Sequence, residues 1–279
     1  MAGRLQGKVA FITGAARGQG RSHAVRMAEE GADIIAVDIC ADIETVTAYG
    51  LATEADLAET VRLVEALDRR IVAAKADVRD IDALTQAVER GVAELGRLDT
   101  VVANAGIFSH ALESHNYGEQ AWADVIDVNQ TGVWHTVKAA MPHILATGSG
   151  GSLILISSLA GTKGLASLAS YTAAKHGVVG LMKVLANEYG RHGIRVNTIH
   201  PNAIATDMVQ NETLYRIFRP DLETPTLEDA LPAFAGMNPF GVPFIDSVHV
   251  SNAVVFLASD ESLYISGAQL PVDAAAAIA

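Results

Sequence analysis

Seven short runs of apolar residues recur along the chain, and longer stretches separate them. Within each run the apolar character is nearly continuous, whereas a strand with one face in water alternates apolar and polar residues. Nearly continuous apolar runs are typical of strands that are buried on both faces of a sheet. Of all the sequence features, these runs constrain the fold most. The runs cover residues 9–12, 34–37, 71–74, 98–103, 152–156, 194–199 and 269–272.

The stretches between the runs have the periodicity of amphipathic helices, with apolar residues recurring about every 3.6 positions. Strands that alternate with helices predict an α/β fold with a parallel sheet. We therefore expect a single-domain Rossmann fold over residues 1–279, a doubly wound sheet of about seven strands with helices on both faces. The helices are predicted at residues 20–30, 54–67, 81–95, 120–146, 171–189 and 248–257.

Two connections between predicted strands and helices are longer than is usual in a fold of this kind. Residues 39–53 follow the second strand, where a connection of a few residues is usual. Residues 207–247 hold five of the eight prolines and are expected to form a partly irregular substrate loop or lid. Long connections at the carboxyl edge of such a sheet tend to carry function, so both are candidates for parts of a site.

Charge and cysteine content exclude several functions. The net charge of −12 and a pI near 5.1 argue against nucleic-acid or anionic-membrane partners, which need clustered Lys and Arg. Cys40 is the one cysteine, so neither an internal disulfide nor a cysteine-based zinc site is expected, and no histidine pair suggests another metal site. With no secretory signal and no long apolar run, we expect a cytoplasmic protein that does not span a membrane.

A glycine-rich turn follows the first apolar run and opens the first helix. It reads Thr13-Gly-Ala-Ala-Arg-Gly-Gln-Gly20. Gly14 permits a tight turn, Gly18 lets a pyrophosphate approach the backbone, and Gly20 lets the helix pack closely on the strand. Because the helix then offers free N–H groups to phosphates, the turn predicts a nucleotide site that includes Arg17 and Gln19.

Asp38 ends the second run, where the adenine ribose lies in this layout. A carboxylate accepts hydrogen bonds from both ribose hydroxyls and repels a 2′-phosphate, so NAD is predicted over NADP. Asp38 could instead be a helix-cap or turn residue. Arg17 beside the glycine turn could attract a 2′-phosphate, which keeps an NADP-dependent ketone reductase open as an alternative.

Four further residues suggest acid–base chemistry. Tyr171 and Lys175 are four residues apart and share a helix face, Ser158 follows the fifth run, and Asn129 lies in the helix before it. A free tyrosine has a pKa near ~10, and a nearby ammonium is expected to lower it toward the working pH. Tyr171 is thus the predicted acid/base and Ser158 the hydroxyl that holds the substrate oxygen. A solvated helix face is the alternative for a Tyr-x-x-x-Lys pair.

Together these motifs resemble the short-chain dehydrogenase/reductase family over roughly residues 5–273. The resemblance implies a catalytic tetrad of Asn129, Ser158, Tyr171 and Lys175, in which Tyr171 exchanges the alcohol proton, Lys175 binds the nicotinamide ribose and Asn129 helps to hold a relay water. It rests on residues 13–20, Asp77, Asn104-Ala105-Gly106, Asn129, Ser157-Ser158, residues 171–175 and residues 195–197.

The resemblance also implies further cofactor contacts besides Tyr171 and Lys175. They come from Asp77, Val78, Asn104, Ala105, Gly106, Pro201 and Thr206. The chain departs from the family pattern at Ala103, where a second asparagine is frequent, and at Asn202 and Ala274, where glycine is usual.

A narrower likeness is to carveol dehydrogenases of the mycofactocin-coupled subfamily. It rests on residues 3–20, on Arg21-Ser22-His23-Ala24 and on the insertion at 40–53. The resemblance implies that the insertion covers the adenine half of NAD and hinders its exchange, so that electrons leave through an external redox partner. The alternative is a surface loop without this role.

The expected substrate is a small hydrophobic secondary alcohol or its ketone, such as a carveol-like terpenoid, because the predicted lining is apolar. That lining comprises Ile107, Phe108, Leu159, Ala160 and parts of 203–244, including Phe218, Phe234, Met237, Phe240 and Phe244. The family is commonly tetrameric, so a homotetramer is expected; Trp122 and Trp134 are predicted either at a subunit interface or in the core. A non-catalytic nucleotide-sensing protein is the alternative from another class.

Overall fold

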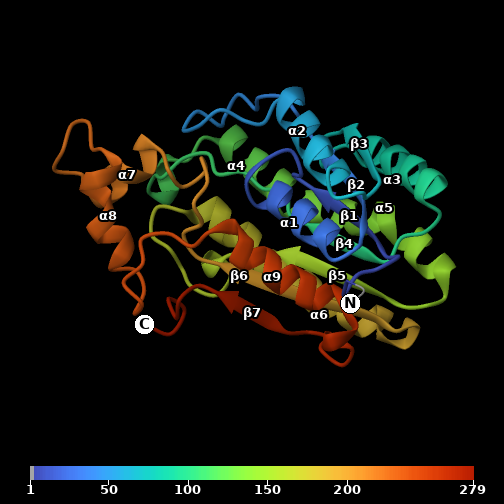
Figure 1. The fold of residues 1–279 in the computed structure, drawn as a ribbon. Coiled ribbons are helices and arrows are strands. Elements are labelled where there is room, and N and C mark those ends of the chain that lie inside the picture. The colour runs from blue at the N-terminus through green and yellow to red at the C-terminus, as the bar shows by residue number, and fades with distance from the viewer. Residues whose placement is uncertain (1–2) are drawn as a thin grey trace.

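One sheet of seven parallel strands organises the protein, shown in Figure 1 as a computed structural model that describes residues 3–279. The strand order is β3-β2-β1-β4-β5-β6-β7, so the direction of winding reverses between β1 and β4. The doubly wound parallel sheet predicted from the apolar runs is confirmed. The strands are β1 (Val9–Thr13), β2 (Asp33–Asp38), β3 (Ile71–Lys75), β4 (Thr100–Ala103), β5 (Gly151–Ile156), β6 (Ile194–Pro201) and β7 (Gln269–Val272).

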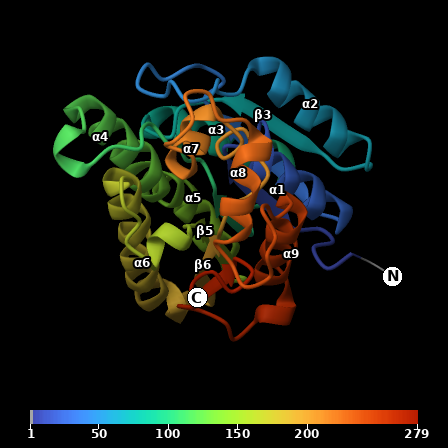
Figure 2. The same cartoon turned by 90° about the vertical axis from the view of Figure 1, so that its left-hand side faces the viewer.

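Helices cover both faces of the sheet. Figure 2 shows α4 and α6 on one side and α1 and α9 on the other, with α7 and α8 at the end that faces the viewer. The helices are α1 (Gly18–Glu29), α2 (Glu54–Glu65), α3 (Ile81–Leu95), α4 (Glu119–Ile126), α5 (Gly132–Thr147), α6 (Ala169–Tyr189), α7 (Glu212–Phe218), α8 (Leu227–Ala235) and α9 (Ser247–Ala258).

The strand side chains alternate between two cores, as the pleat requires. Val9 and Phe11 of β1 pack in a core with α3, α5 and α6, whereas Ala10 and Ile12 pack in a core with α1, α2 and α9. Each face of the central strands is therefore dry, which explains why their sequences are continuously apolar.

Side-chain caps open α2 and α3 beside the cleft, as they also open α7 and α8. The Thr53 hydroxyl accepts from the backbone N–H of Asp56, and the Asp56 carboxylate accepts from the N–H of Thr53, which forms a capping box at the start of α2. The Asp80 carboxylate caps α3 by accepting from the backbone N–H groups of Asp82 and Ala83, each at 3.0 Å. These caps fix where the chain leaves the insertion and where it leaves the turn after β3.

The single helix predicted at 120–146 is wrong in one respect. A π-helical turn, Asp127–Thr131, separates α4 from α5 and carries Asn129. One residue too many enters the turn there, which rotates the side chains that follow; such turns are frequent at functional sites. Apolar periodicity does not reveal a change of this size, because α4 and α5 each keep a buried face.

Residues 207–247 are more ordered than a loop rich in proline suggests. They contain α7 and α8, and they form a small apolar cluster apart from the two main cores. Its buried members are Ala203, Tyr215, Ala230 and Phe234. This segment therefore has a core of its own.

Candidate active site

A cleft of about 450 Å³ opens at the carboxyl ends of the strands, beside the reversal in strand order. Predicted cofactor residues that line it are Gly14, Arg17, Gly18, Gln19, Gly20, Asp38, Asp77, Val78, Asn104, Ala105, Gly106 and Thr206. The insertion contributes Ile39, Ile43, Tyr49, Leu51 and Ala52. Residues for which the sequence predicted no cofactor contact are Arg21, Asp56, Ala76, Val128, Ala205, Asp207 and Met208.

The glycine turn borders the cleft in a form that only glycine allows. Gly14 has a φ of +66°, and a Cβ there would lie 2.8 Å from Cα of Ala105. A Cβ at Gly20 would overlap the Gly14 carbonyl oxygen, so the close approach of helix and strand predicted for Gly20 is confirmed. No described side chain caps the start of α1 at Arg17. Its first amides thus remain available to an anionic ligand.

Asp38 is buried at the end of β2 and lines the cleft. Its carboxylate accepts from the backbone N–H of Ala16 at 3.0 Å and of Cys40 at 3.2 Å. Within residues 3–279 it forms no ion pair, so its charge is not neutralised by a cation. A carboxylate has about four acceptor positions, which leaves capacity for two hydroxyl donors.

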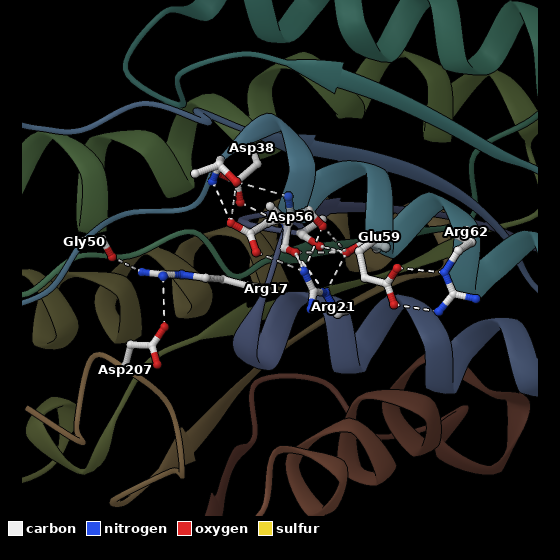
Figure 3. A network of polar contacts seen from close by, with 12 residues as sticks. Arg17, Arg21, Asp38, Gly50, Asp56, Glu59, Arg62 and Asp207 are labelled. Carbon is white, nitrogen blue, oxygen red and sulfur yellow. Dashed lines mark hydrogen bonds and ion pairs between the residues drawn. The ribbon is translucent and has the colours of Figure 1, made fainter.

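Arg17 lines the cleft, and its guanidinium lies between Gly50 and Asp207, as Figure 3 shows. Nη1 pairs with Asp207 at 2.9 Å, Nη2 donates to the Gly50 carbonyl oxygen, and the guanidinium carbon lies 6.0 Å from the centroid of the Tyr49 ring. Arg17 thereby joins the insertion to the segment that follows β6. Because Asp207 neutralises it, Arg17 offers less attraction to a 2′-phosphate than the sequence suggested.

Arg21 is a cleft residue that sequence reasoning missed. Its Nη2 donates to the carbonyl oxygens of Ala16 at 2.6 Å and of Asp56 at 2.8 Å, and the guanidinium also pairs with the Asp56 carboxylate at 3.5 Å (Figure 3). It thus fastens the glycine turn to α2. The one available signal is position, because Arg21 lies near the start of the first predicted helix, directly after the glycine turn.

The insertion is docked against the cleft by side chains along its length. Thr45 donates to the Asp124 carboxylate of α4 at 2.7 Å, and Asp42 accepts from the N–H of Leu51 at 3.2 Å. The Tyr49 hydroxyl accepts from the N–H of Phe108 at 3.1 Å. The insertion therefore reaches beyond the glycine turn to the segment after β4.

Asp77 and Asn104 lie at the ends of β3 and β4, as predicted. Asp77 pairs with Arg79 at 2.7 Å. The Asn104 amide donates to the carbonyl oxygens of Thr13 at 3.0 Å and Gly14 at 3.2 Å. Asn104 thus ties β4 to the glycine turn while it lines the cleft.

Asn129 and Lys175 come together beside Gly106. A Cβ on Gly106 would lie 3.3 Å from Asn129 Oδ1 and 3.6 Å from Lys175 Nζ. Both side chains are buried, and Lys175 Nζ donates to the Ile156 carbonyl oxygen at 2.8 Å. Since Gly106 lines the cleft, two members of the predicted tetrad lie next to the candidate cofactor site.

Tyr171 and Ser158 complete this cluster, but the expected effect of Lys175 on Tyr171 is wrong. Burial raises the pKa of Tyr171, and only the neighbouring Ser158 side chain opposes the rise. Lys175 Nζ lies 5.6 Å from the ring centroid, and its own burial lowers its pKa to about 8. Desolvation, which disfavours a phenolate, thus outweighs the attraction that the sequence suggested.

The other predicted cofactor contacts, Pro201, Tyr171 and Lys175, are not among the residues that line this cleft, and their contact with the cofactor stays a prediction. Pro201 lies at the end of β6, where its register partner is Val272. Sequence reasoning gave no role to His200, yet its Nδ1 donates to the Ser158 carbonyl oxygen at 2.8 Å. His200 therefore helps to hold the residue that carries the predicted substrate contact.

The aromatic residues of 207–247 mostly contact one another. The Phe234 ring lies between Phe218 and Phe244, with centroids 4.6 and 4.8 Å away, whereas Phe240 is exposed. Ile107 does line the cleft. Phe218, Phe234 and Phe244 therefore pack on one another, and the contact of this segment with a substrate stays a prediction.

Trp122 and Trp134 are not core residues. They are 42% and 44% exposed, on α4 and α5. Lys138 Nζ lies 4.8 Å from the centroid of the Trp134 ring. The alternative of core packing is therefore wrong for both.

Two kinds of feature are absent from residues 3–279. No helix there is long and apolar enough to cross a membrane. The same residues hold no group of three or more His, Cys, Asp or Glu side chains that could bind a metal ion. Cys40 is buried, and burial raises the pKa of its thiol to about 11.

Known proteins resemble this chain over nearly its whole length. The (−)-trans-carveol dehydrogenase of Rhodococcus erythropolis is 54% identical over 97% of this chain and 98% of its own. The crystal structure of carveol dehydrogenase from Mycobacterium avium in complex with NAD is 55% identical, with a TM-score of 0.98 and coverage of 99% and 100%. A short chain dehydrogenase from Mycobacterium paratuberculosis bound to NAD is 45% identical, with a TM-score of 0.90 and coverage of 99% of each chain.

The family of short chain dehydrogenases matches residues 8–215. That span runs from β1 into α7 and includes the glycine turn, the π-helical turn and the helix that carries Tyr171 and Lys175. The chain therefore belongs to the short chain dehydrogenase family.

Proposed function

We propose that this protein is an NAD-dependent alcohol dehydrogenase that interconverts a hydrophobic secondary alcohol, of the carveol-like terpenoid type, and its ketone. The observation that carries the proposal is the convergence of Asn129 and Lys175 at Gly106, where the nucleotide cleft meets the helix of Tyr171. Relatives named carveol dehydrogenase, more than half identical to this chain, support the substrate class.

The residues present fit NAD. The uncapped start of α1 suits the pyrophosphate, and the unpaired carboxylate of Asp38 suits a ribose with free hydroxyls. Two structural relatives are NAD complexes. When bound, NAD⁺ supplies the acceptor for the hydride that the alcohol carbon loses.

In the proposed reaction, the protein's own side chains handle the proton. Tyr171 removes the proton of the alcohol hydroxyl during oxidation and returns it during reduction. Ser158 holds the same oxygen by a hydrogen bond. Lys175 supplies positive charge and donors next to Gly106, and Asn129 stands beside it in the π-helical turn. These roles follow the tetrad that the family resemblance implies.

Turnover of carveol tests the proposed function. Purified protein is assayed with NAD⁺ alone and then with an added redox dye, followed by detection of carvone. Ketone formation in either format supports the dehydrogenase. If carveol and a wider panel of hydrophobic secondary alcohols all give no ketone, the proposed substrate class is wrong.

The same assay addresses whether NAD exchanges. We propose that the insertion at 39–53 retains the cofactor and that an external, mycofactocin-type redox partner takes the electrons. Its contacts to α4, Phe108 and Arg17 support this. Dye reduction without free NADH, with NAD copurifying, is the expected result; steady release of NADH would contradict it.

Arg17 is predicted to control that retention. Arg17→Gln removes the pair with Asp207 and weakens the hold on Gly50, contacts that lie on opposite sides of the cleft mouth. Release of bound NADH should accelerate by about tenfold, the equivalent of roughly 1.4 kcal/mol for a partly exposed charged network. Fluorescence stopped-flow measures the rate. Arg62→Gln, which removes an exposed pair with Glu59, is the matched control, and equal rates in both variants would contradict the role of Arg17.

Asp38 is predicted to determine the choice between NAD and NADP. Asp38→Ala removes an acceptor of ribose hydroxyls and a charge that repels a 2′-phosphate. The ratio of affinities should move toward NADP by about 10- to 100-fold, because hydrogen bonds to charged groups contribute roughly 1.5–3 kcal/mol. NADH and NADPH fluorescence titrations measure it, with the exposed Asp82→Ala as control. An unchanged ratio in a folded variant would refute the ribose role.

We also propose that the protein is a cytoplasmic homotetramer. Each subunit would be one Rossmann-type domain, in which residues 207–247 form the substrate lid. The part-exposed rings of Trp122 and Trp134 on α4 and α5 support an interface there. Light scattering at micromolar concentration tests the assembly, and a monomeric mass would contradict it.

A further inference from the structure

Tyr49 is the residue of the insertion that forms a hydrogen bond with the segment after β4. It lines the cofactor cleft and packs against the core beneath α3, α5 and α6. Its hydroxyl accepts from the backbone N–H of Phe108 at 3.1 Å. Phe108 belongs to the segment after β4, so this hydrogen bond spans the cleft from the β2 side to the β4 side.

The neighbouring peptide group is held by Asn129. Asn129 Oδ1 accepts from the N–H of Ile107 at 2.7 Å, and its Nδ2 donates to the Ile107 carbonyl oxygen at 2.8 Å. The next N–H along the chain, that of Phe108, donates to the Tyr49 hydroxyl. Two side chains from distant segments therefore hold consecutive residues, and both Ile107 and Phe108 are buried.

We infer that Tyr49 is a positioning residue that couples the insertion to the catalytic centre by fixing the Ile107–Phe108 segment against Asn129. The inference rests on the proposed function, because it takes Asn129 to be part of the catalytic tetrad. Under this inference the insertion has a second role. Besides covering the cofactor, it keeps Asn129 in position in the catalytic centre.

The physical reason is the cost of a buried donor without a partner. If the Tyr49 hydroxyl is removed, the Phe108 N–H loses its acceptor in a buried setting, and the backbone shifts to find another. Asn129 bonds to the residue before, so a shift there moves Asn129 relative to Gly106 and Lys175. Small displacements of a positioned group lower rates strongly even when binding is little changed.

Tyr49 is suited to this task across the working pH range. Burial raises its pKa to about 12, so the phenol stays neutral and does not compete with Tyr171 as a base. Its ring is partly buried in the core, which fixes the position of the hydroxyl. The ring provides anchorage and the hydroxyl provides the contact, and the two can be tested separately.

Tyr49→Phe keeps the ring and removes the hydroxyl. We expect kcat for alcohol oxidation to fall by about tenfold while KM for the alcohol changes by less than about threefold, as a loss felt mainly in the transition state requires. Tyr264→Phe, at a side chain 95% exposed, is the matched control and should match the wild type. An unchanged kcat in Tyr49→Phe overturns the inference.

A double-mutant cycle with Asn129→Ser separates positioning from general damage. If Tyr49 acts through Asn129, Tyr49→Phe should reduce kcat about tenfold in the wild type but less than about threefold in the Asn129→Ser background. Independent effects that multiply would overturn the inference.

Hydrogen exchange provides a readout that needs no activity. The peptide covering residues 105–112 should exchange about tenfold faster in Tyr49→Phe than in the wild type, while a peptide from α3 stays unchanged. Unchanged exchange at 105–112 overturns the inference even if Asn129→Ser fails to fold. If exchange increases as expected but no variant or wild-type protein oxidises any alcohol, the proposed function fails and the structural coupling stands.

Discussion

Tyr171→Phe is expected to lose nearly all alcohol oxidation while the protein keeps its fold and its cofactor. Phenylalanine fills the same space but has no proton to exchange, and general acid–base catalysis contributes about 10²- to 10⁴-fold. We therefore expect kcat/KM to fall by about three orders of magnitude. Because phenylalanine keeps the ring and removes only the hydroxyl, NADH affinity should stay within about threefold of the wild type.

The pH dependence of the wild type provides the companion test. Burial raises the pKa of Tyr171, so the base form becomes populated only in the alkaline range. Alcohol oxidation should therefore accelerate as the pH rises above neutrality, because the fraction of phenolate increases. Ketone reduction needs the protonated phenol, so it should stay nearly constant until the pH approaches the raised pKa of Tyr171 and should slow down only above it. Near-normal turnover of Tyr171→Phe, or an unchanged pH profile in that variant, would refute the assignment.

Lys175→Met is expected to inactivate the enzyme and to stabilise the fold. Lys175 is 3% exposed, and burial lowers its pKa from 10.5 to about 8. Each pKa unit corresponds to 1.36 kcal/mol, so the buried charge costs roughly 3 kcal/mol at neutral pH. Methionine fills a similar volume without a charge. Turnover should fall by about 10²-fold or more, and Tm should rise by roughly 5 °C.

The pKa of Lys175 is lower in the folded protein than in the unfolded chain, and this difference determines how stability depends on pH. Below about pH 8 both the folded and the unfolded lysine carry a proton, and the full cost of the buried charge applies. Between about 8 and 10.5 the folded lysine loses its proton while the unfolded one keeps it, so the wild type gains stability as the pH rises. The Tm advantage of Lys175→Met should shrink across this window. A less stable variant at pH 7 would contradict the argument.

The strands and most helices could be predicted because buried positions carry apolar residues, and the spacing of these residues differs between strands and helices. A run such as 34–37 is apolar at every position, since one set of its side chains faces α1 and the other faces α3. The glycine turn could also be predicted from the sequence. At Gly14 and Gly20 a side chain would collide with neighbouring backbone atoms, so only glycine fits at these positions.

Other features depend on contacts between distant segments, which one sequence does not display. The π-helical turn at Asn129 leaves the apolar pattern of α4 and α5 intact. The hydrogen bond from Phe108 to Tyr49 joins segments far apart in the chain. The pKa of Tyr171 was predicted in the wrong direction because helix spacing reveals the nearby Lys175 but not the burial of the phenol, which raises the pKa.

The aromatic cluster of residues 207–247 has a consequence for how proteins of this kind diversify. Phe234 packs with Phe218 and Phe244 in a cluster separate from the cores under the sheet. A segment with its own core can be remodelled without disturbing the strands that hold the nucleotide cleft. Asp207 and Met208 line the nucleotide cleft, so an exchange of residues 209–247 between relatives would spare them. If this segment is the substrate lid proposed above, such an exchange should transfer substrate preference while the recipient keeps its cofactor and its thermal stability.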